Sequence, residues 1–129
     1  MQRWLLVGIL GGFLAVMLGA FGAHALKARL DESSLSVFKT ATEYLMFHSV
    51  ALIGLGLWGS TSAAAGSPRA ASLAGALFSA GILLFSGSLY SLAMTGIRKL
   101  GIITPFGGLS FLMGWATWGW AVWSGFRSR

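Results

Sequence analysis

The chain has 129 residues, of which 56% are hydrophobic and 9% are charged, and its formal net charge is +6. Soluble domains carry about 25% charged residues, so this composition excludes an ordinary soluble protein. The absence of cysteine excludes disulfides, thiolate metal sites and cysteine nucleophiles. The basic residues lie at segment ends and in loops, which is typical of anchoring to lipid headgroups, so we expect no nucleic acid partner.

Four long stretches contain no Asp, Glu, Lys or Arg: Trp4–Leu26, Tyr44–Pro68, Ala70–Ile97 and Leu100–Phe126. A bilayer core of about 30 Å is crossed by about 20 residues of α-helix. The sequence therefore predicts an all-α integral membrane protein whose first partner is the lipid bilayer. We expect a single domain over residues 1–129, with spanning helices at about 4–26, 43–59, 70–95 and 105–126.

Residues 27–42, KARLDESSLSVFKTAT, form the only markedly polar stretch. Apolar residues recur in it at helical spacing, and Asp31, Ser33 and Ser34 can each cap a helix start. This pattern predicts a short interfacial helix between the first two spanning helices.

The connections between the later helices are short. Residues 60–69 are small and polar and contain Gly66 and Pro68, which predicts a turn. Residues 96–105 form a second tight connection, and Pro105 suits the first turn of the last helix. Short loops favour an up-down-up-down four-helix bundle. Lys and Arg are almost evenly divided between its two ends and do not decide the orientation. We expect both termini in the cytoplasm, because the acidic residues all lie at the other end.

Small residues follow a regular spacing along the first helix and recur in the third and fourth. In lipid the hydrophobic effect does not drive helices together, and small residues permit close backbone approach. We interpret these positions as helix-packing surface, with hinges in a transporter as the alternative. The residues are Gly8, Gly11, Gly12, Ala15, Gly19, Ala23, Gly75 and Gly114.

Polar residues inside or beside the apolar stretches are few, and the alternating topology places them near one membrane surface. Ionisable groups in membranes are costly and usually face the bundle interior. The candidate polar cluster comprises His24, Glu43, Tyr44, His48, Tyr90 and Thr104.

Three interpretations of this cluster compete. It forms interhelical hydrogen bonds that lock the bundle, it holds a metal ion or haem through His24 and His48, or it lines a path for protons or small solutes. The first is favoured, because two histidines and one carboxylate make no recognisable catalytic geometry. Lipase, P-loop and zinc-protease motifs are absent. We therefore expect no enzyme activity, no metal and no cofactor.

Five blocks of the sequence resemble the signature blocks of the YgdD/YwdK-like membrane proteins, a bacterial family of unknown function with eukaryotic relatives. The blocks, in order along nearly the whole chain, are GAFGAH (Gly19–His24), EYLMFHS (Glu43–Ser49), FSGSLY (Phe85–Tyr90), TPFGG (Thr104–Gly108) and GW (Gly114–Trp115). The resemblance implies a multi-pass protein of the bacterial inner membrane, and it brings no assigned reaction, substrate or cofactor. Motif positions are matched by His24, Glu43, His48, Tyr90, Thr104 and Pro105.

Two classes of function remain open from the sequence. The first is a structural or accessory subunit that docks on a larger membrane complex or helps to assemble it, which the small-residue faces favour. The second is a small-solute or ion transporter or channel that acts as an oligomer, because four short helices enclose little space. We expect part of the small-residue or aromatic surface to face lipid, another membrane protein or a second copy of the chain.

Overall fold

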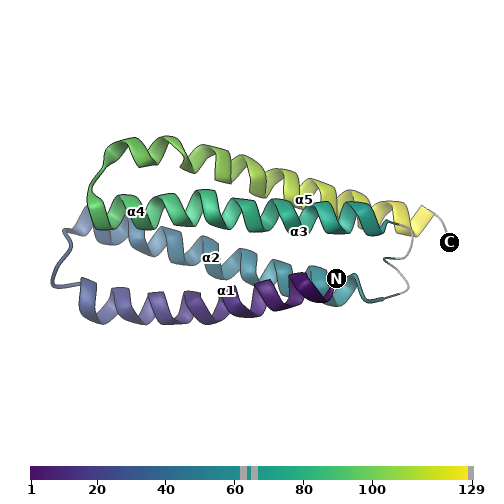
Figure 1. Cartoon of the computed structure of the whole chain (residues 1–129), viewed down its shortest axis with the longest axis horizontal. Coiled ribbons are helices and arrows are strands. Elements are labelled where there is room, and N and C mark those ends of the chain that lie inside the picture. Colours follow the sequence, from purple (N-terminus) through teal and green to yellow (C-terminus); the bar gives the residue numbers. More distant parts are fainter. Residues whose placement is uncertain (62–63, 65–66, 128–129) are drawn as a thin grey trace.

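The computed structural model describes residues 1–61, 64 and 67–127, and all regular secondary structure in these ranges is helical (Figure 1). The first half of the chain forms α1 (Gln2–Phe21), its π-helical continuation η1 (Gly22–Leu26), and α2 (Glu32–Trp58). The second half forms α3 (Pro68–Gly81), the π-helix η3 (Ile82–Ser86), α4 (Gly87–Thr95), the 3-10 helix η4 (Arg98–Ile102) and α5 (Thr104–Arg127). Figure 1 shows the helices lying along a common long axis, with both termini near the same end.

Three helical segments of the described chain are long and apolar enough to cross a membrane: Gln2–Leu26, Pro68–Thr95 and Arg98–Arg127. The sequence predicts a fourth span over residues 43–59. The helix there, α2, has 27 residues, but Glu43, Tyr44 and His48 interrupt its apolar part. His48 itself is buried against the other helices.

A separate interfacial helix is not present in the described residues, because α2 runs without a break from Glu32 to Trp58. The helix starts at Asp31, whose carboxylate accepts a hydrogen bond of 2.7 Å from the backbone N–H of Ser34. Of the three capping residues that the sequence offers, Asp31 is therefore the one that ends the connection after α1. This start places Glu43 about three turns into α2 and His48 more than four turns into it.

In the connection over residues 60–69, Pro68 is the first residue of α3, and the predicted break at Gly66 lies outside the described residues.

Replacement of Asp31 by alanine is expected to lower the thermal stability of the protein in detergent at neutral pH. The Ser34 N–H holds the pKa of the Asp31 carboxyl below its ordinary value of 3.8. A lowered pKa means that the charged cap stabilises the fold above that value and that this stabilisation is lost as the pH falls through the folded-state pKa. Melting curves at pH 7 and pH 3 should thus show a difference between wild type and Asp31→Ala that narrows in acid. Asp31→Asn, which keeps an acceptor at every pH, is the control; equal losses in both variants at pH 7 would contradict the capping role.

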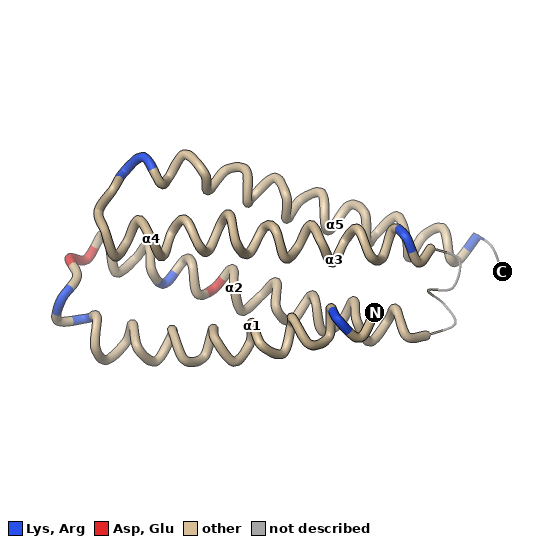
Figure 2. Tube along the Cα trace, in the orientation of Figure 1, with Lys and Arg blue, Asp and Glu red and all other residues tan. Residues whose placement is uncertain are grey.

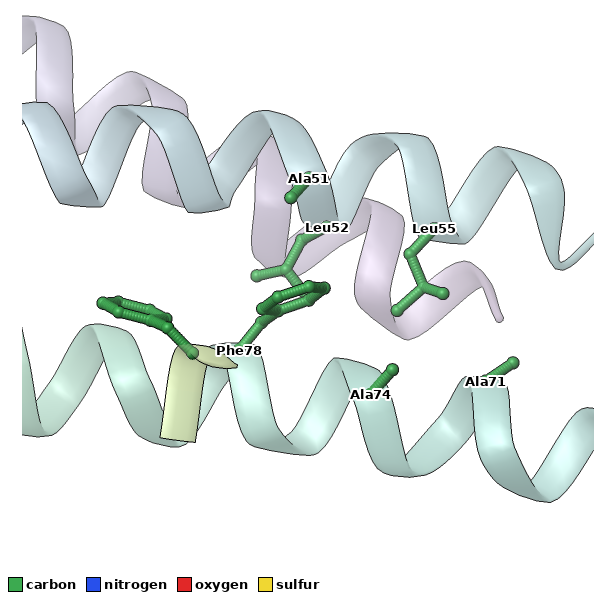
Figure 3. Packing of buried hydrophobic residues seen from close by; sticks show 7 residues of the cluster. Ala51, Leu52, Leu55, Ala71, Ala74 and Phe78 are labelled. Carbon is green, nitrogen blue, oxygen red and sulfur yellow. The ribbon is translucent and has the colours of Figure 1, made fainter. Parts of the chain in front are cut away.

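The largest buried cluster joins α2, α3 and α5 (Figure 3). Phe78 of α3 has no exposed surface, and its ring lies beside Leu52 of α2, while Leu55 of α2 lies farther along the same cluster and is also fully buried (Figure 3). Three of the other members are alanines, so the helices approach closely there. The full set is Ala51, Leu52, Leu55, Ala71, Ala74, Phe78 and Phe111.

A smaller cluster at the opposite end joins η1, α2 and α4 through Leu26, Phe38 and Ala93. Between the two clusters α2 contacts α1, η3 and α4, so α2 is the helix that holds the two halves of the chain together.

Large apolar side chains cover the outside of the molecule, and many are more than half exposed, such as Phe13, Leu83 and Leu112. Charged residues gather at the two ends of the helices, with a few in the first half of α2 (Figure 2). An apolar band between two charged ends is the surface that a bilayer stabilises.

The predicted helix-packing residues have different surroundings. Gly8, Gly11 and Ala15 are buried, and a Cβ added at Gly8 would lie 2.7 Å from the carbonyl oxygen of Ser49 and 2.8 Å from the backbone nitrogen of Ile53. The backbones of α1 and α2 therefore meet at Gly8, where only a glycine fits.

Two of the predicted packing glycines outside α1 accommodate aromatic rings. Gly75 is buried beneath the indole of Trp4, and Gly114 lies against the ring of Phe78, at 2.8 Å from an added Cβ. Their role in the structure is to admit a flat side chain from a neighbouring helix.

The other three predicted packing residues have no close contact with a neighbouring helix. An added Cβ at Gly12 would meet no atom within 4 Å, and one at Gly19 would meet only Thr42, at an ordinary contact distance of 3.5 Å. Ala23 is exposed. These three small residues therefore do not pack closely against α2, although Gly22 farther along the same helix is buried against Phe38.

Candidate functional site

His48 lies at the centre of an aromatic cluster between α2 and α5. Its imidazole is 4% exposed and stacks on Phe111, with ring centroids 3.5 Å apart and planes inclined by 8°. The indole N–H of Trp115 donates to His48 Nε2 at 3.3 Å, and Nδ1 lies 2.9 Å from the carbonyl oxygen of Tyr44. Because Nε2 accepts, Nδ1 carries the proton and donates to the carbonyl. Both ring nitrogens of a neutral His48 are thereby satisfied.

The rings around His48 line a pocket of about 610 Å³ that opens on the side of the molecule. We call it the aromatic pocket. Tyr44 closes one wall by stacking on Phe85, with ring centroids 4.2 Å apart, and η3 is the wide helical turn that carries Phe85. The lining residues are Glu43, Tyr44, Phe47, His48, Phe85, Gly108, Phe111, Leu112 and Trp115.

A second cavity of about 800 Å³ lies on the other side of Glu43 and Phe47, between α1 and α2. We call it the α1–α2 cleft. Its α1 wall consists mostly of small residues, and Lys39 and Glu43 bring charge to its α2 wall. The lining residues are Ala15, Val16, Gly19, Ala20, Gly22, Ala23, Phe38, Lys39, Thr42, Glu43, Met46, Phe47 and Val50.

The structure divides the polar cluster that the sequence predicts. Glu43, Tyr44 and His48 line the aromatic pocket together. Tyr90 instead pairs with Thr42, with 2.7 Å between the two hydroxyl oxygens. Thr104 lies apart from both, and its hydroxyl is 2.6 Å from that of Ser88. Two of the six residues therefore tie neighbouring helices together at separate points, α2 to α4 and α4 to α5.

His24 does not join any of these groups. It is exposed on η1, at the far end of α1, whereas His48 lies level with Gly11, whose added Cβ would contact the neighbouring Ser49. Thirteen residues of helix separate these levels, which is about 20 Å along the axis. One metal ion or haem iron cannot bind both histidines at that separation. Among the described residues no group of three or more His, Cys, Asp and Glu side chains could hold a metal ion.

The residues predicted for the site did not include Phe111 and Trp115, the aromatic partners of His48 on α5, or Phe85, which stacks on Tyr44. Phe85 and Trp115 belong to the blocks FSGSLY and GW that carry the family resemblance, and Phe111 lies between the blocks TPFGG and GW. Their membership of one site could not be deduced from spacing, because the contacts of His48 join α2 and α5, more than 60 residues apart. The occurrence of aromatic residues in several separate blocks was the available signal.

Comparison with known proteins assigns the chain to a family. The family described as protein of unknown function (DUF423) matches residues 18–108. The UPF0382 membrane protein SAB0533 of Staphylococcus aureus is 43% identical over 115 residues, which is 89% of this chain and 90% of the relative. The UPF0382 membrane protein YwdK of Bacillus subtilis is 41% identical over 115 residues, 89% of this chain and 91% of the relative.

A third relative matches over a similar share of its length. The UPF0382 membrane protein of Haemophilus influenzae is 41% identical over 114 residues, covering 88% of each chain. No solved structure matches this chain. The predicted resemblance to YwdK-like membrane proteins is confirmed, and the chain belongs to the DUF423 family, whose function is unknown.

Proposed function

We propose that this protein is a non-enzymatic accessory or assembly subunit that docks laterally on a larger protein of the bacterial inner membrane. In this proposal the four helical rods cross the bilayer up-down-up-down. The first turns of α2 lie at the membrane surface, because Asp31 and Glu32 begin that helix. The aromatic pocket and the α1–α2 cleft then open sideways, toward lipid or a neighbouring membrane protein.

The observation that carries this proposal is the open half of the small-residue face of α1. Gly8 and Gly11 are buried against the chain's own α2, but Ala15, Gly19, Ala20 and Ala23 line the α1–α2 cleft. Membrane helices associate where small residues let two backbones approach, since lipid provides no hydrophobic driving force between them. A groove lined by glycine and alanine is thus suited to a helix of another protein.

The docking proposal can be tested without disturbing the fold. A photo-cross-linking amino acid at Ala20 should give a protein adduct of one defined mass in native membranes, whereas the same label at Leu83, which is 74% exposed on η3, should give mostly lipid adducts. Gly19→Leu should fill the cleft and suppress the Ala20 adduct while the melting temperature in detergent changes little. Lipid adducts alone at both positions would refute docking at this cleft. An adduct of twice the chain mass would identify a second copy as the partner.

The orientation of the bundle is part of the same proposal. Arg3, Arg69 and Arg127 lie toward the end that carries both termini, and the cations of the opposite end are accompanied by Asp31 and Glu32. We place the end with the termini in the cytoplasm, because its positive charge is not offset. A reporter enzyme that is active only in the cytoplasm, fused after the last residue, should therefore be active.

One observation favours the alternative function, a small-solute or ion transporter or channel that acts as an oligomer. Glu43 lines both cavities, and an ionisable side chain inside an apolar band is a common feature of transport paths. Solute flux into proteoliposomes that Glu43→Gln abolishes would support this alternative over the accessory role.

A further inference from the structure

We propose that the aromatic pocket is a binding site for an organic cation, an ammonium group carried on an apolar body, with Glu43 as its counter-ion. This inference is independent of docking at the α1–α2 cleft, because the pocket opens between α2 and α5. It concerns binding and requires no transport step.

The size and lining of the pocket suit a small apolar ligand. Its volume of about 610 Å³ falls within the range of about 300–1,000 Å³ that is usual for small-molecule sites. Apart from His48 and Glu43, the seven other lining residues are aromatic, aliphatic or glycine. Such a lining is favourable for the apolar body of a ligand, and the few polar groups decide which head group it accepts.

Two aromatic rings at the mouth of the pocket can receive the positive charge. The ring centroids of Phe47 and Trp115 are 5.9 Å apart, and both side chains are partly exposed, Phe47 to 62%. A cation is attracted to an aromatic face within about 6 Å of the ring centroid. One ammonium group can therefore lie within that distance of both rings at once.

Glu43 supplies the negative charge at the same mouth. Among the residues that the structure describes, the side chain of Glu43 has no hydrogen bond or ion pair. Glu43 directly precedes the uncharged stretch that begins at Tyr44, and an exposed carboxylate beside such a stretch is costly unless a cation or water accompanies it. Lys39, one turn earlier on α2, lines only the α1–α2 cleft and forms no ion pair with Glu43 within the described chain. The charge of Glu43 is thus available to a ligand.

The remaining polar groups of the pocket disfavour an anion. The Trp115 N–H is occupied by His48, and the proton of His48 faces the Tyr44 carbonyl. Among the described lining side chains, the Tyr44 hydroxyl is then the one donor left over. A phosphate or carboxylate ligand would find a carboxylate, π faces and too few N–H or O–H groups, whereas an ammonium group finds complementary charge.

The proposal is tested with phenyltrimethylammonium and its neutral isostere tert-butylbenzene. Isothermal titration of the full chain in maltoside micelles, with titration of empty micelles subtracted, should show saturable binding of the cation and weaker binding of the neutral compound. Glu43→Gln should weaken cation binding by about tenfold or more, and Phe47→Leu by a smaller factor. Glu32→Gln removes a carboxylate of α2 that does not line the pocket, and it should leave the affinity unchanged.

Melting of each variant in detergent checks that it is folded. Glu43→Gln should melt at the same temperature as wild type, because the Glu43 side chain forms no hydrogen bond or ion pair within the described chain. Equal affinity for both compounds, an unchanged affinity in Glu43→Gln, or no saturable binding would each overturn the proposal.

A competition experiment then identifies the source of the ammonium group. Displacement of the cation in phosphatidylglycerol nanodiscs by added phosphatidylethanolamine supports a lipid headgroup as ligand, and no displacement supports a free organic cation.

Discussion

Gly8→Leu is expected to destabilise the protein by about 1–3 kcal/mol or more, the range that is usual when a side chain is forced into a well-packed interior. The atoms in its way belong to the backbone of α2, because an added Cβ would lie 2.7 Å from the Ser49 carbonyl oxygen and 2.8 Å from the Ile53 nitrogen. A backbone cannot turn aside as the end of a flexible side chain can, so α1 and α2 must separate. Melting in detergent, followed by circular dichroism, measures the loss.

Gly12→Leu is the matched control, because it makes the same change one turn later on the same helix. No atom lies within 4 Å of an added Cβ there, so the melting temperature should change little. The two glycines form a GxxxG pair in the sequence, and equal destabilisation by the two substitutions would show that α1 packs through a different face from the one described.

His48→Ala is expected to cost about 2–4 kcal/mol of stability, from the sum of lost ring stacking and an unpaired donor. The substitution removes the ring that stacks on Phe111 and leaves the Trp115 N–H without its acceptor. Little of this loss is hydrophobic, because lipid is as apolar as the pocket. Melting in detergent together with the near-ultraviolet circular dichroism of the tryptophans should report both the loss of stability and the loosening of Trp115.

His24→Ala provides the comparison for His48→Ala, since it deletes the other histidine of the chain at an exposed position. It should leave both the melting curve and the tryptophan signal unchanged. If the two variants behaved alike, the separation of the two histidines in the fold would be refuted.

The helical class of the fold could be predicted from the sequence because it depends on local properties. Long stretches without charge, with Pro68 and Pro105 near helix starts, set the positions of α3 and α5 to within a few residues of the structure. These signals involve residues close together in the chain, and they need no knowledge of how the helices pack.

The start of α2 shows why the predicted polar cluster is divided. Length and charge suggest a spanning helix from residue 43, which places Glu43 and His48 at a membrane surface beside His24. The helix capped by Asp31 instead begins 11 residues before Glu43 and is continuous. His48 therefore lies about three turns farther from the helix start than in the prediction. Tyr44 and His48, which are four residues apart on α2, both line the same pocket.

The spacing of small residues along α1 also had a limit as a predictor. The period of four identifies one face of the helix, but it cannot say how far along that face a neighbour extends. In the structure the backbones of α1 and α2 come close together at Gly8, whereas the contact at Gly19 is only an ordinary one with Thr42. The crossing of two helices is a tertiary property, and it separates the buried part of the face from the open cleft.

The most direct test of the account is the depth in the bilayer of the residues beside the aromatic pocket. The chain has no cysteine, so a single spin label can be placed at Phe47→Cys or at His24→Cys in liposomes without other changes. We predict that the label at position 47 collides often with oxygen and rarely with a water-soluble nickel complex, as expected within the hydrocarbon region of a bilayer, and that the label at position 24 shows the reverse. A label at position 47 that the nickel complex reaches as readily as it reaches position 24 would contradict the placement of α2 and of its pocket.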